Sequence, residues 1–99
     1  GKAINVLYEN IDSGKRVVED FDMVVLANAV TPPDGLSRLA TRLNIELDGD
    51  GFIRTNEKLG GMVMTTRPGI YTAGCVSGPK DIPDSVAEGS GAAALALGI

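Results

Sequence analysis

Two side chains in one turn of the sequence have types suited to chemistry, Cys75 and Lys80. Cys75 follows a glycine just before a predicted helix, and a helix N-terminus favours the thiolate, the reactive form in redox reactions. The alternative for this cysteine is packing as a small, buried apolar side chain. Lys80 carries a cation that can stabilise negative charge on a bound group. Its alternative is a solvent-exposed pair with Asp81 or Asp84.

The elements around this turn are a short apolar strand over Gly69–Ala73 and a helix over Asp81–Leu97. Pro83 lies near the predicted helix start, where its missing N–H costs nothing, and Asp81 favours the positive end of the helix dipole. The helix consists mostly of small residues, and each glycine in it costs about 1 kcal/mol against alanine. That cost is easier to explain if the small residues allow close approach to a sheet or a ligand. A strand, a tight turn and such a helix bring backbone N–H groups close to a bound cofactor.

The N-terminal third predicts a β-meander of three strands. The first strand is expected over Ala3–Asn10 and the second over Arg16–Asp20, with a turn at Asp12–Lys15 because Asp, Ser and Gly tolerate positive φ. Asp22–Ala27 is expected as a third strand, and its nearly continuous apolar run predicts burial on both faces. Two prolines, at 32 and 33, then end any strand.

The middle of the chain predicts one helix and one short hairpin. We expect Asp34 to cap a helix that ends near Asn44. Its apolar face has helical spacing, with Arg38 and Arg42 on another face in solvent, and consists of Leu36, Leu39, Ala40 and Leu43. Ile45–Thr55 predicts a hairpin with glycines at the bend. Leu59–Thr66 is expected to be a loop or an edge segment.

The composition of the chain argues against several classes of partner and of catalytic or metal site. The chain has 99 residues, a net charge of −4 and no basic block, which argues against nucleic acid or an anionic membrane as a partner. Its apolar run Ala92–Leu97 is far shorter than the roughly 20 residues of a membrane span. A single cysteine and the lack of a signal-peptide pattern predict a reducing, cytoplasmic location, and the chain has no histidine. The same counts exclude a His/Cys zinc site, a Ser-His-Asp triad and a four-cysteine iron–sulfur centre within the chain.

A calcium site is the main alternative from the sequence. Glu46–Glu57 nearly fits an EF-hand loop, with Asp48, Asp50 and Glu57 at its third, fifth and twelfth positions. The first position, however, is Glu46 rather than aspartate. Two glycines, at 60 and 61, interrupt the helix that should follow. The chain would then be a non-catalytic interaction or calcium-binding module.

The residues from Thr65 onward resemble the second flavin-binding motif of flavoproteins that have two dinucleotide-binding domains. In that motif a threonine precedes an apolar strand that ends in Ala-Gly-Asp and leads into a helix. Cys75 stands where the aspartate is expected. From Gly74 through Val86 the sequence resembles the A subunit of heterodisulfide reductase, with related subunits of membrane-associated sulfate-respiration complexes second.

The resemblance implies an α/β fold, as a fragment of a two-dinucleotide-binding-domain flavoprotein: a β-meander followed by a helix, a hairpin, a strand and a C-terminal helix. Residues 1–33 would be the end of the nicotinamide-type domain, comprising the meander and the crossover. Residues 34–99 would be the C-terminal part of the FAD-binding domain. At the crossover, Asn28 and Ala29 replace the Thr-Gly that such flavoproteins often have.

The resemblance also implies which residues bind the cofactor. Lys80 would lie close to flavin N5, and backbone N–H groups near Ile82–Val86 would face the pyrimidine edge of the ring. Cys75 would lie beside the ribityl chain, and because a thiol donates and accepts only weakly, the contacts there would be made by backbone groups. No catalytic residue and no metal ligand is implied. The cofactor-binding set is Gly74, Cys75, Lys80, Asp81, Ile82, Pro83, Ser85 and Val86.

The implied function is that of a flavin-dependent oxidoreductase component that passes electrons between FAD and iron–sulfur clusters, with the cluster ligands outside this chain and other subunits as partners. The chain has no Gly-x-Gly-x-x-Gly turn for the pyrophosphate, so alone it should bind FAD weakly and be inactive. An NAD(P)H-dependent flavoprotein of the disulfide-reductase type is the second enzymatic interpretation. Because two domains would contribute to the chain, we also expect uncovered apolar faces and self-association.

Overall fold

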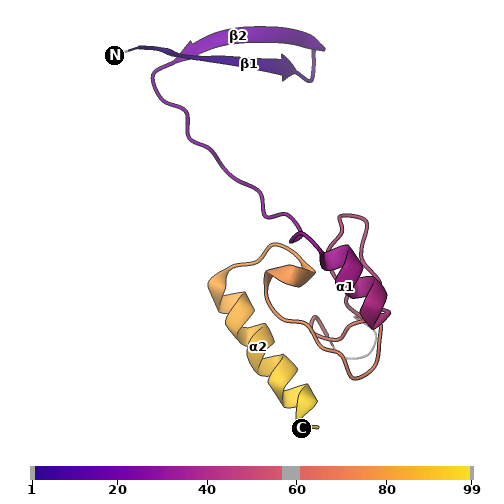
Figure 1. Cartoon of the computed structure of the whole chain (residues 1–99). Coiled ribbons are helices and arrows are strands. Elements are labelled where there is room, and N and C mark those ends of the chain that lie inside the picture. Colours follow the sequence, from indigo (N-terminus) through magenta and orange to yellow (C-terminus); the bar gives the residue numbers. More distant parts are fainter. Residues whose placement is uncertain (1, 57–60, 99) are drawn as a thin grey trace.

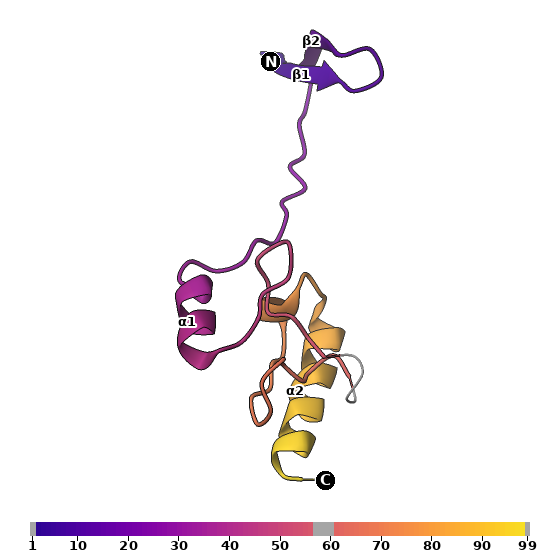
Figure 2. The ribbon, with the colours of Figure 1, turned by 90° about the vertical axis from the view of Figure 1, so that its right-hand side faces the viewer.

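The computed structural model describes residues 2–56 and 61–98. An antiparallel hairpin lies at one end of an elongated molecule of 59 × 26 × 25 Å (Figure 1). An extended segment joins the hairpin to a body that contains both helices, and the view turned by 90° shows the same separation (Figure 2). The chain is thus a small α/β structure. Its assignment to two dinucleotide-binding domains, divided at residues 33 and 34, stays a prediction.

The hairpin has the two strands that the sequence predicts. β1 (Ile4–Asn10) and β2 (Lys15–Phe21) pair antiparallel, with Ile4 opposite Phe21. The side chain of Asn10 closes the turn, because its Oδ1 accepts the backbone N–H groups of residues 12 and 13 at 3.0 and 3.2 Å. Gly14 has a φ of 65°, so the turn contains the positive φ expected from its composition.

The predicted third strand is wrong. Across the described part of the chain, the run Asp22–Ala27 belongs to no strand, and its apolar side chains are exposed instead of buried. The chain leaves the hairpin directly after Phe21 and extends towards the body (Figure 1). A strand requires a neighbour that supplies backbone hydrogen bonds, and a two-stranded hairpin offers no second sheet to cover an apolar run.

Helix α1 (Leu36–Leu43) ends as predicted but begins differently. Its N-cap is Gly35, with a φ of 83° and no side-chain hydrogen bond, so Asp34 does not cap it. Asn44 ends the helix in the left-handed conformation with a φ of 56°. Leu36 and Ala40 are buried and Arg38 and Arg42 are exposed, as expected, but Leu39 is also exposed.

The body is held by turns and isolated bridges around a small core. Leu36, Ile45 and Ile53 form this core, which is extended by the half-buried Leu43, Leu47, Ile70 and Val76. The predicted hairpin over Ile45–Thr55 is present as a single antiparallel bridge between Leu47 and Ile53.

The strand predicted over Gly69–Ala73 is wrong, because this described segment forms only one bridge, between Tyr71 and Met64. Its backbone bonds reach one neighbour, because the N–H of Thr72 donates to Val63 at 2.8 Å and Ile70 accepts the N–H of Thr65 at 3.3 Å, and one short contact of this kind does not make a strand. The loop or edge segment expected over Leu59–Thr66 lies partly outside the described residues; from residue 61 on it contributes bridges to Thr55 and Tyr71.

Helix α2 (Ile82–Ala96) confirms the predicted C-terminal helix, with Asp81 as its N-cap and Pro83 in its first turn. A Cβ added to Gly91 would lie 3.9 Å from Val63, an ordinary contact, whereas one added to Gly89 would meet nothing within 4 Å. The small residues are therefore not all explained by packing within this chain. Neither helix in the described ranges has the length and apolar character required to cross a membrane.

Candidate functional site

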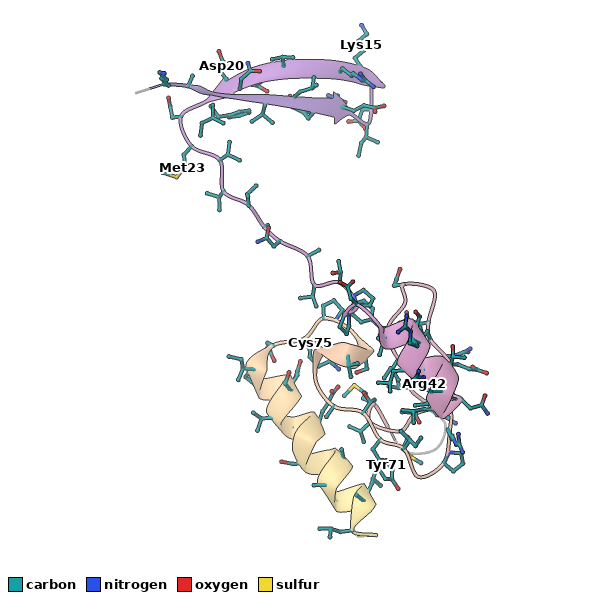
Figure 3. All side chains as sticks on the ribbon, in the orientation of Figure 1. Lys15, Asp20, Met23, Arg42, Tyr71 and Cys75 are labelled. Carbon is teal, nitrogen blue, oxygen red and sulfur yellow. The ribbon has the colours of Figure 1, made fainter. Side chains whose placement is uncertain are left out.

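A pocket with a volume of about 610 Å³ lies at the start of α2. Seven of the eight residues predicted to bind a cofactor line it: Cys75, Lys80, Asp81, Ile82, Pro83, Ser85 and Val86. The eighth, Gly74, is the N-cap of the short 3-10 helix η2 (Cys75–Ser77), which leads into the pocket. Figure 3 shows Cys75 in the body, apart from the hairpin that carries Lys15 and Asp20. The structure thus brings together residues that the sequence could only place in order.

Two glycines give the turn its shape. Gly74 has φ 82° and ψ −162°, and Gly78 has φ 143° and ψ 166°, conformations that residues with side chains rarely adopt. Between them, Ser77 bonds back to the carbonyl of Gly74 with its hydroxyl at 3.2 Å and its backbone N–H at 3.4 Å. The sequence Gly-Cys-Val-Ser-Gly therefore folds into one tight turn that presents Cys75 at the surface.

The helix start is capped by its own side chains. Asp81 accepts the N–H of Asp84 through Oδ1 at 2.9 Å, and its carbonyl accepts the hydroxyl of Ser85 at 2.8 Å. Pro83 has no N–H, and the first N–H groups of a helix lack partners within the helix. The amide of Ile82 is therefore the group in this first turn that is best placed for an outside acceptor.

The remaining wall of the pocket is apolar and uncovered. Ile82 is 80% exposed and Val86 is 64% exposed, and both line the pocket. Burial of apolar surface is favourable by roughly 25 cal/mol per Å², so such a wall favours a partner that covers it. A flat, mostly apolar group with acceptors at one edge would match both this wall and the amide of Ile82.

Lys80 is held inside the turn. Its ammonium group donates to Glu88 Oε1 at 2.5 Å and to Ser77 Oγ at 2.8 Å. The side chain of Lys80 is 13% exposed and that of Glu88 is 6% exposed. The alternative of a solvent-exposed pair with Asp81 or Asp84 is therefore wrong, since the partner is a buried carboxylate in the middle of α2.

Glu88 is the residue of this site that the sequence did not predict. Besides Lys80, it accepts the backbone N–H of Gly74 through Oε2 at 2.8 Å. The sequence held one signal for it: Glu88 is the only charged side chain after Asp84, in a helix otherwise made of small and apolar residues. A lone charge in such a helix indicates a specific partner, because an unpaired buried charge is costly.

Cys75 is exposed, so its interpretation as a buried apolar side chain is wrong. Its thiol donates to the carbonyl oxygen of Lys80 at 3.6 Å, which links the two ends of the turn. The chain has no second cysteine. A disulfide exchange within the chain is therefore excluded, whereas a contact between Cys75 and a bound group fits its place at the pocket.

The calcium-loop alternative finds no support in the described residues. Asp48 Oδ1 accepts the backbone N–H groups of Asp50 and Phe52, both at 2.9 Å, so this carboxylate closes its own turn. Glu46 pairs with Arg54 at 3.3 Å. Across residues 2–56 and 61–98, no three acidic, cysteine or histidine side chains are grouped to hold a metal ion. Glu57 lies outside the described residues.

Comparison with known proteins extends these findings. No protein-family model matches the chain. A protein of Archaeoglobus profundus that is named as like the A subunit of heterodisulfide reductase is 44% identical over 86 residues, which make up 87% of this chain and 12% of that protein. The A subunit of the H(2):CoB-CoM heterodisulfide,ferredoxin reductase of Methanothermobacter thermautotrophicus is 41% identical over 94% of this chain and 14% of its own length.

A third relative is the iron-sulfur A subunit of the CoB–CoM heterodisulfide reductase of Methanocaldococcus jannaschii, which is 39% identical over 93% of this chain and 14% of its own length. Because each similarity extends over nearly the whole chain, it includes α1 and the residues that line the pocket. The chain therefore belongs to the family of heterodisulfide reductase A subunits, and it spans 12–14% of the length of these relatives.

Proposed function

We propose that the pocket at the start of α2 is one wall of a flavin site in a heterodisulfide reductase A-like oxidoreductase. The observation that carries this proposal is the pocket lining: seven of the eight residues named by the flavoprotein resemblance line one pocket of about 610 Å³. Six of these residues lie between positions 80 and 86, at the start of α2, and the structure adds Cys75 to them from the turn before the helix. The identity to relatives that are A subunits of heterodisulfide reductases supports the same assignment.

The residues present fit one part of FAD. The uncovered apolar wall of Ile82 and Val86 suits the flat isoalloxazine ring, and the amide of Ile82 suits a carbonyl at the pyrimidine edge. The chain has no Gly-x-Gly-x-x-Gly turn for the pyrophosphate, so this half of the cofactor would bind to other parts of the protein. The chain by itself is then expected to bind FAD weakly.

FAD would supply the electron-transfer chemistry, and the chain would orient it. Ile82, Pro83 and Val86 would exclude water from one side of the bound group, and Asp81 holds the helix start in place through its cap. Lys80 brings a cation to the pocket, where positive charge stabilises negative charge on a reduced cofactor. The Glu88 carboxylate at 2.5 Å offsets part of that charge. Contact between Lys80 and flavin N5 stays part of the proposal.

The electron partners belong to the proposal as well. The Methanocaldococcus relative is named an iron-sulfur subunit, and the Methanothermobacter relative is named as one subunit of a reductase. We infer that electrons pass between FAD and iron–sulfur clusters whose ligands lie outside this chain, since it has a single cysteine. Other subunits of a reductase complex would be its partners, in the cytoplasm.

The test is flavin occupancy in the full-length protein that carries this chain. Val86→Asp places a charge on the apolar wall and should lower FAD occupancy, measured by absorbance after purification, by at least tenfold. The matched control is Ile11→Asp at the tip of the hairpin, also an exposed apolar residue, and it should retain its flavin. Equal flavin content in the Val86→Asp and wild-type proteins would overturn the proposal.

A further inference from the structure

The carboxylate of Glu88 is unusual in its helix because it is buried. The Glu88 side chain is 6% exposed, whereas most side chains of α2 are exposed or half-buried. Its two oxygens have separate partners: Oε2 accepts the N–H of Gly74 at 2.8 Å, and Oε1 accepts the ammonium of Lys80 at 2.5 Å. One side chain thus binds both the beginning and the end of the turn that forms the pocket.

These contacts close into a ring. Lys80 also donates to Ser77 Oγ at 2.8 Å, and the hydroxyl of Ser77 donates to the carbonyl of Gly74 at 3.2 Å. Gly74, Glu88, Lys80 and Ser77 therefore form a closed circuit of hydrogen bonds in which the two charges cancel. A buried ion pair adds little net stability over an apolar pair, so its benefit lies in fixing one arrangement of the groups it joins.

Lys80 also lines two cavities. It lines the pocket of about 610 Å³ and a second cavity of about 350 Å³, whose other lining residues are Met62, Val63, Pro79, Asp84, Ala87 and Glu88. Glu88 lines only the second cavity. Glu88 therefore contacts Lys80 without lining the larger pocket, so a ligand there is not expected to touch Glu88.

We propose that Glu88 is a positioning residue of the pocket: it fixes the Gly74–Ser77 turn to α2 and sets the net charge that Lys80 presents to a bound cofactor. The first half of this inference concerns the chain alone. The second half rests on the proposed flavin site. Glu88 acts through Gly74 and Lys80 and not by contact with the cofactor, so no bond to the cofactor is made or broken in this role.

Hydrogen exchange of backbone amides in the 99-residue chain tests the first half. Glu88→Ala should speed exchange of the Gly74 amide by at least tenfold, and Glu88→Gln, which keeps one acceptor oxygen and the size of the side chain, should have a smaller effect. Asp84→Ala is the matched control, because it removes an exposed carboxylate from the same helix. The Ile45 amide, bonded to Ala40 in the core, reports global unfolding. If Gly74 exchange is unchanged, or rises only in parallel with Ile45, Glu88 does not fix the Gly74–Ser77 turn to α2 and the first half of the proposal is overturned.

The flavin midpoint potential of the full-length protein tests the second half. Glu88→Gln leaves the Lys80 cation uncompensated and should raise the potential, whereas Lys80→Met leaves the carboxylate uncompensated and should lower it. The double variant should return close to the wild-type potential, an outcome that a merely structural role does not predict. If both single variants bind flavin and their midpoint potentials shift in the same direction, Glu88 does not set the charge that Lys80 presents, and the second half of the proposal is overturned. A wild-type protein without flavin would overturn the proposed function instead, and the exchange experiment would still decide whether Glu88 fixes the Gly74–Ser77 turn.

Discussion

Gly74 and Glu88 are fourteen residues apart, yet the backbone N–H of Gly74 donates to Oε2 of Glu88 at 2.8 Å. This bond joins the turn before α2 to the middle of the helix. Because these two elements form the pocket, the bond fixes the position of Cys75 on one side relative to Ile82 and Val86 on the other. The proposed role of Glu88 thus makes the shape of the pocket depend on a residue that does not line it.

The buried ion pair should matter more for stability than the exposed one. Glu88→Ala leaves the Lys80 ammonium buried without its partner and should lower the free energy of unfolding by about 3 kcal/mol. Glu46→Ala breaks the pair with Arg54, whose side chains are 65% and 63% exposed, and should cost less than about 1 kcal/mol. Urea unfolding followed by circular dichroism measures both, and equal costs would contradict the expectation.

A double replacement separates the charge from the packing. Lys80→Met combined with Glu88→Met removes both charges and keeps apolar volume, so it should destabilise the chain less than Glu88→Ala does. If the double variant were less stable than Glu88→Ala, the Lys80–Glu88 ion pair would itself stabilise the fold, and the cost of Glu88→Ala would not come only from leaving Lys80 unpaired. The same urea experiment gives this comparison.

Two glycines should respond in opposite ways to alanine. Gly89 lies in α2 with open space around its added Cβ, so Gly89→Ala should stabilise the free chain by roughly 0.5–1 kcal/mol. Gly74 has a φ of 82° and ψ of −162°, so Gly74→Ala should destabilise it by about 1–3 kcal/mol of backbone strain, although its Cβ also meets nothing. Thermal unfolding of the two variants measures the signs, and a destabilising Gly89→Ala would show that the helix packs differently in solution.

The phenol of Tyr8 should lose its proton at a higher pH than an ordinary tyrosine. Its hydroxyl donates to Glu19 Oε2 at 2.8 Å, and this hydrogen bond, followed by partial desolvation and the charge of Glu19, raises the pKa of Tyr8 above its ordinary value near 10. The raised pKa in the fold means that the contact stabilises the hairpin below about pH 10 and is lost as the pH rises through the folded pKa. Tyrosinate absorbance measures this in a Tyr71→Phe background, which leaves Tyr8 as the only tyrosine.

Glu19→Ala is the comparison for this titration. It removes both the acceptor and the charge, so the midpoint of Tyr8 should fall back towards the ordinary value. A midpoint that is identical with and without Glu19 would show that the cross-strand hydrogen bond does not persist in solution.

Self-association of the chain remains an expectation, and the exposed apolar side chains indicate where to test it. Leu7 and Val18 face each other across the hairpin and are exposed, as is Val25 in the extended segment. Leu7→Lys and Val25→Lys should lower the mass measured by light scattering at high concentration. Ile11→Lys, at the hairpin tip, should leave it unchanged. A wild-type chain that is strictly monomeric would contradict the expectation.

Local signals were enough to predict part of the fold. The Asp-Ser-Gly turn predicted the hairpin, and Asn44 predicted the end of α1. Asp81 and Pro83 predicted the start of α2. These signals suffice because caps and turns depend on residues that are neighbours in sequence. The strands at Asp22–Ala27 and Gly69–Ala73 were wrong, because pairing depends on other strands, and apolar character says nothing about whether a partner is present.

The same division holds for the site. The resemblance placed Cys75, Lys80 and Ile82 in one motif, and the structure places them around one pocket. Glu88 escaped prediction because its contacts reach back eight and fourteen residues, to Lys80 and Gly74. Both partners lie before α2 begins, so the periodicity of the helix cannot predict them. They reach Glu88 because the turn between η2 and α2 folds back onto the helix.

The extended segment between the hairpin and the body divides the chain into two parts that are expected to respond independently to substitution. In both views of the ribbon, the described residues of the hairpin lie apart from the body, so the two share no packed surface (Figures 1 and 2). Energetic coupling between residues travels through packed contacts, and a tether of exposed side chains supplies few. Substitutions near Tyr8 should therefore leave the energy of the contacts around Lys80 unchanged. The stabilities of the hairpin and of the pocket can therefore be altered separately, by substitutions in one part that leave the other unchanged.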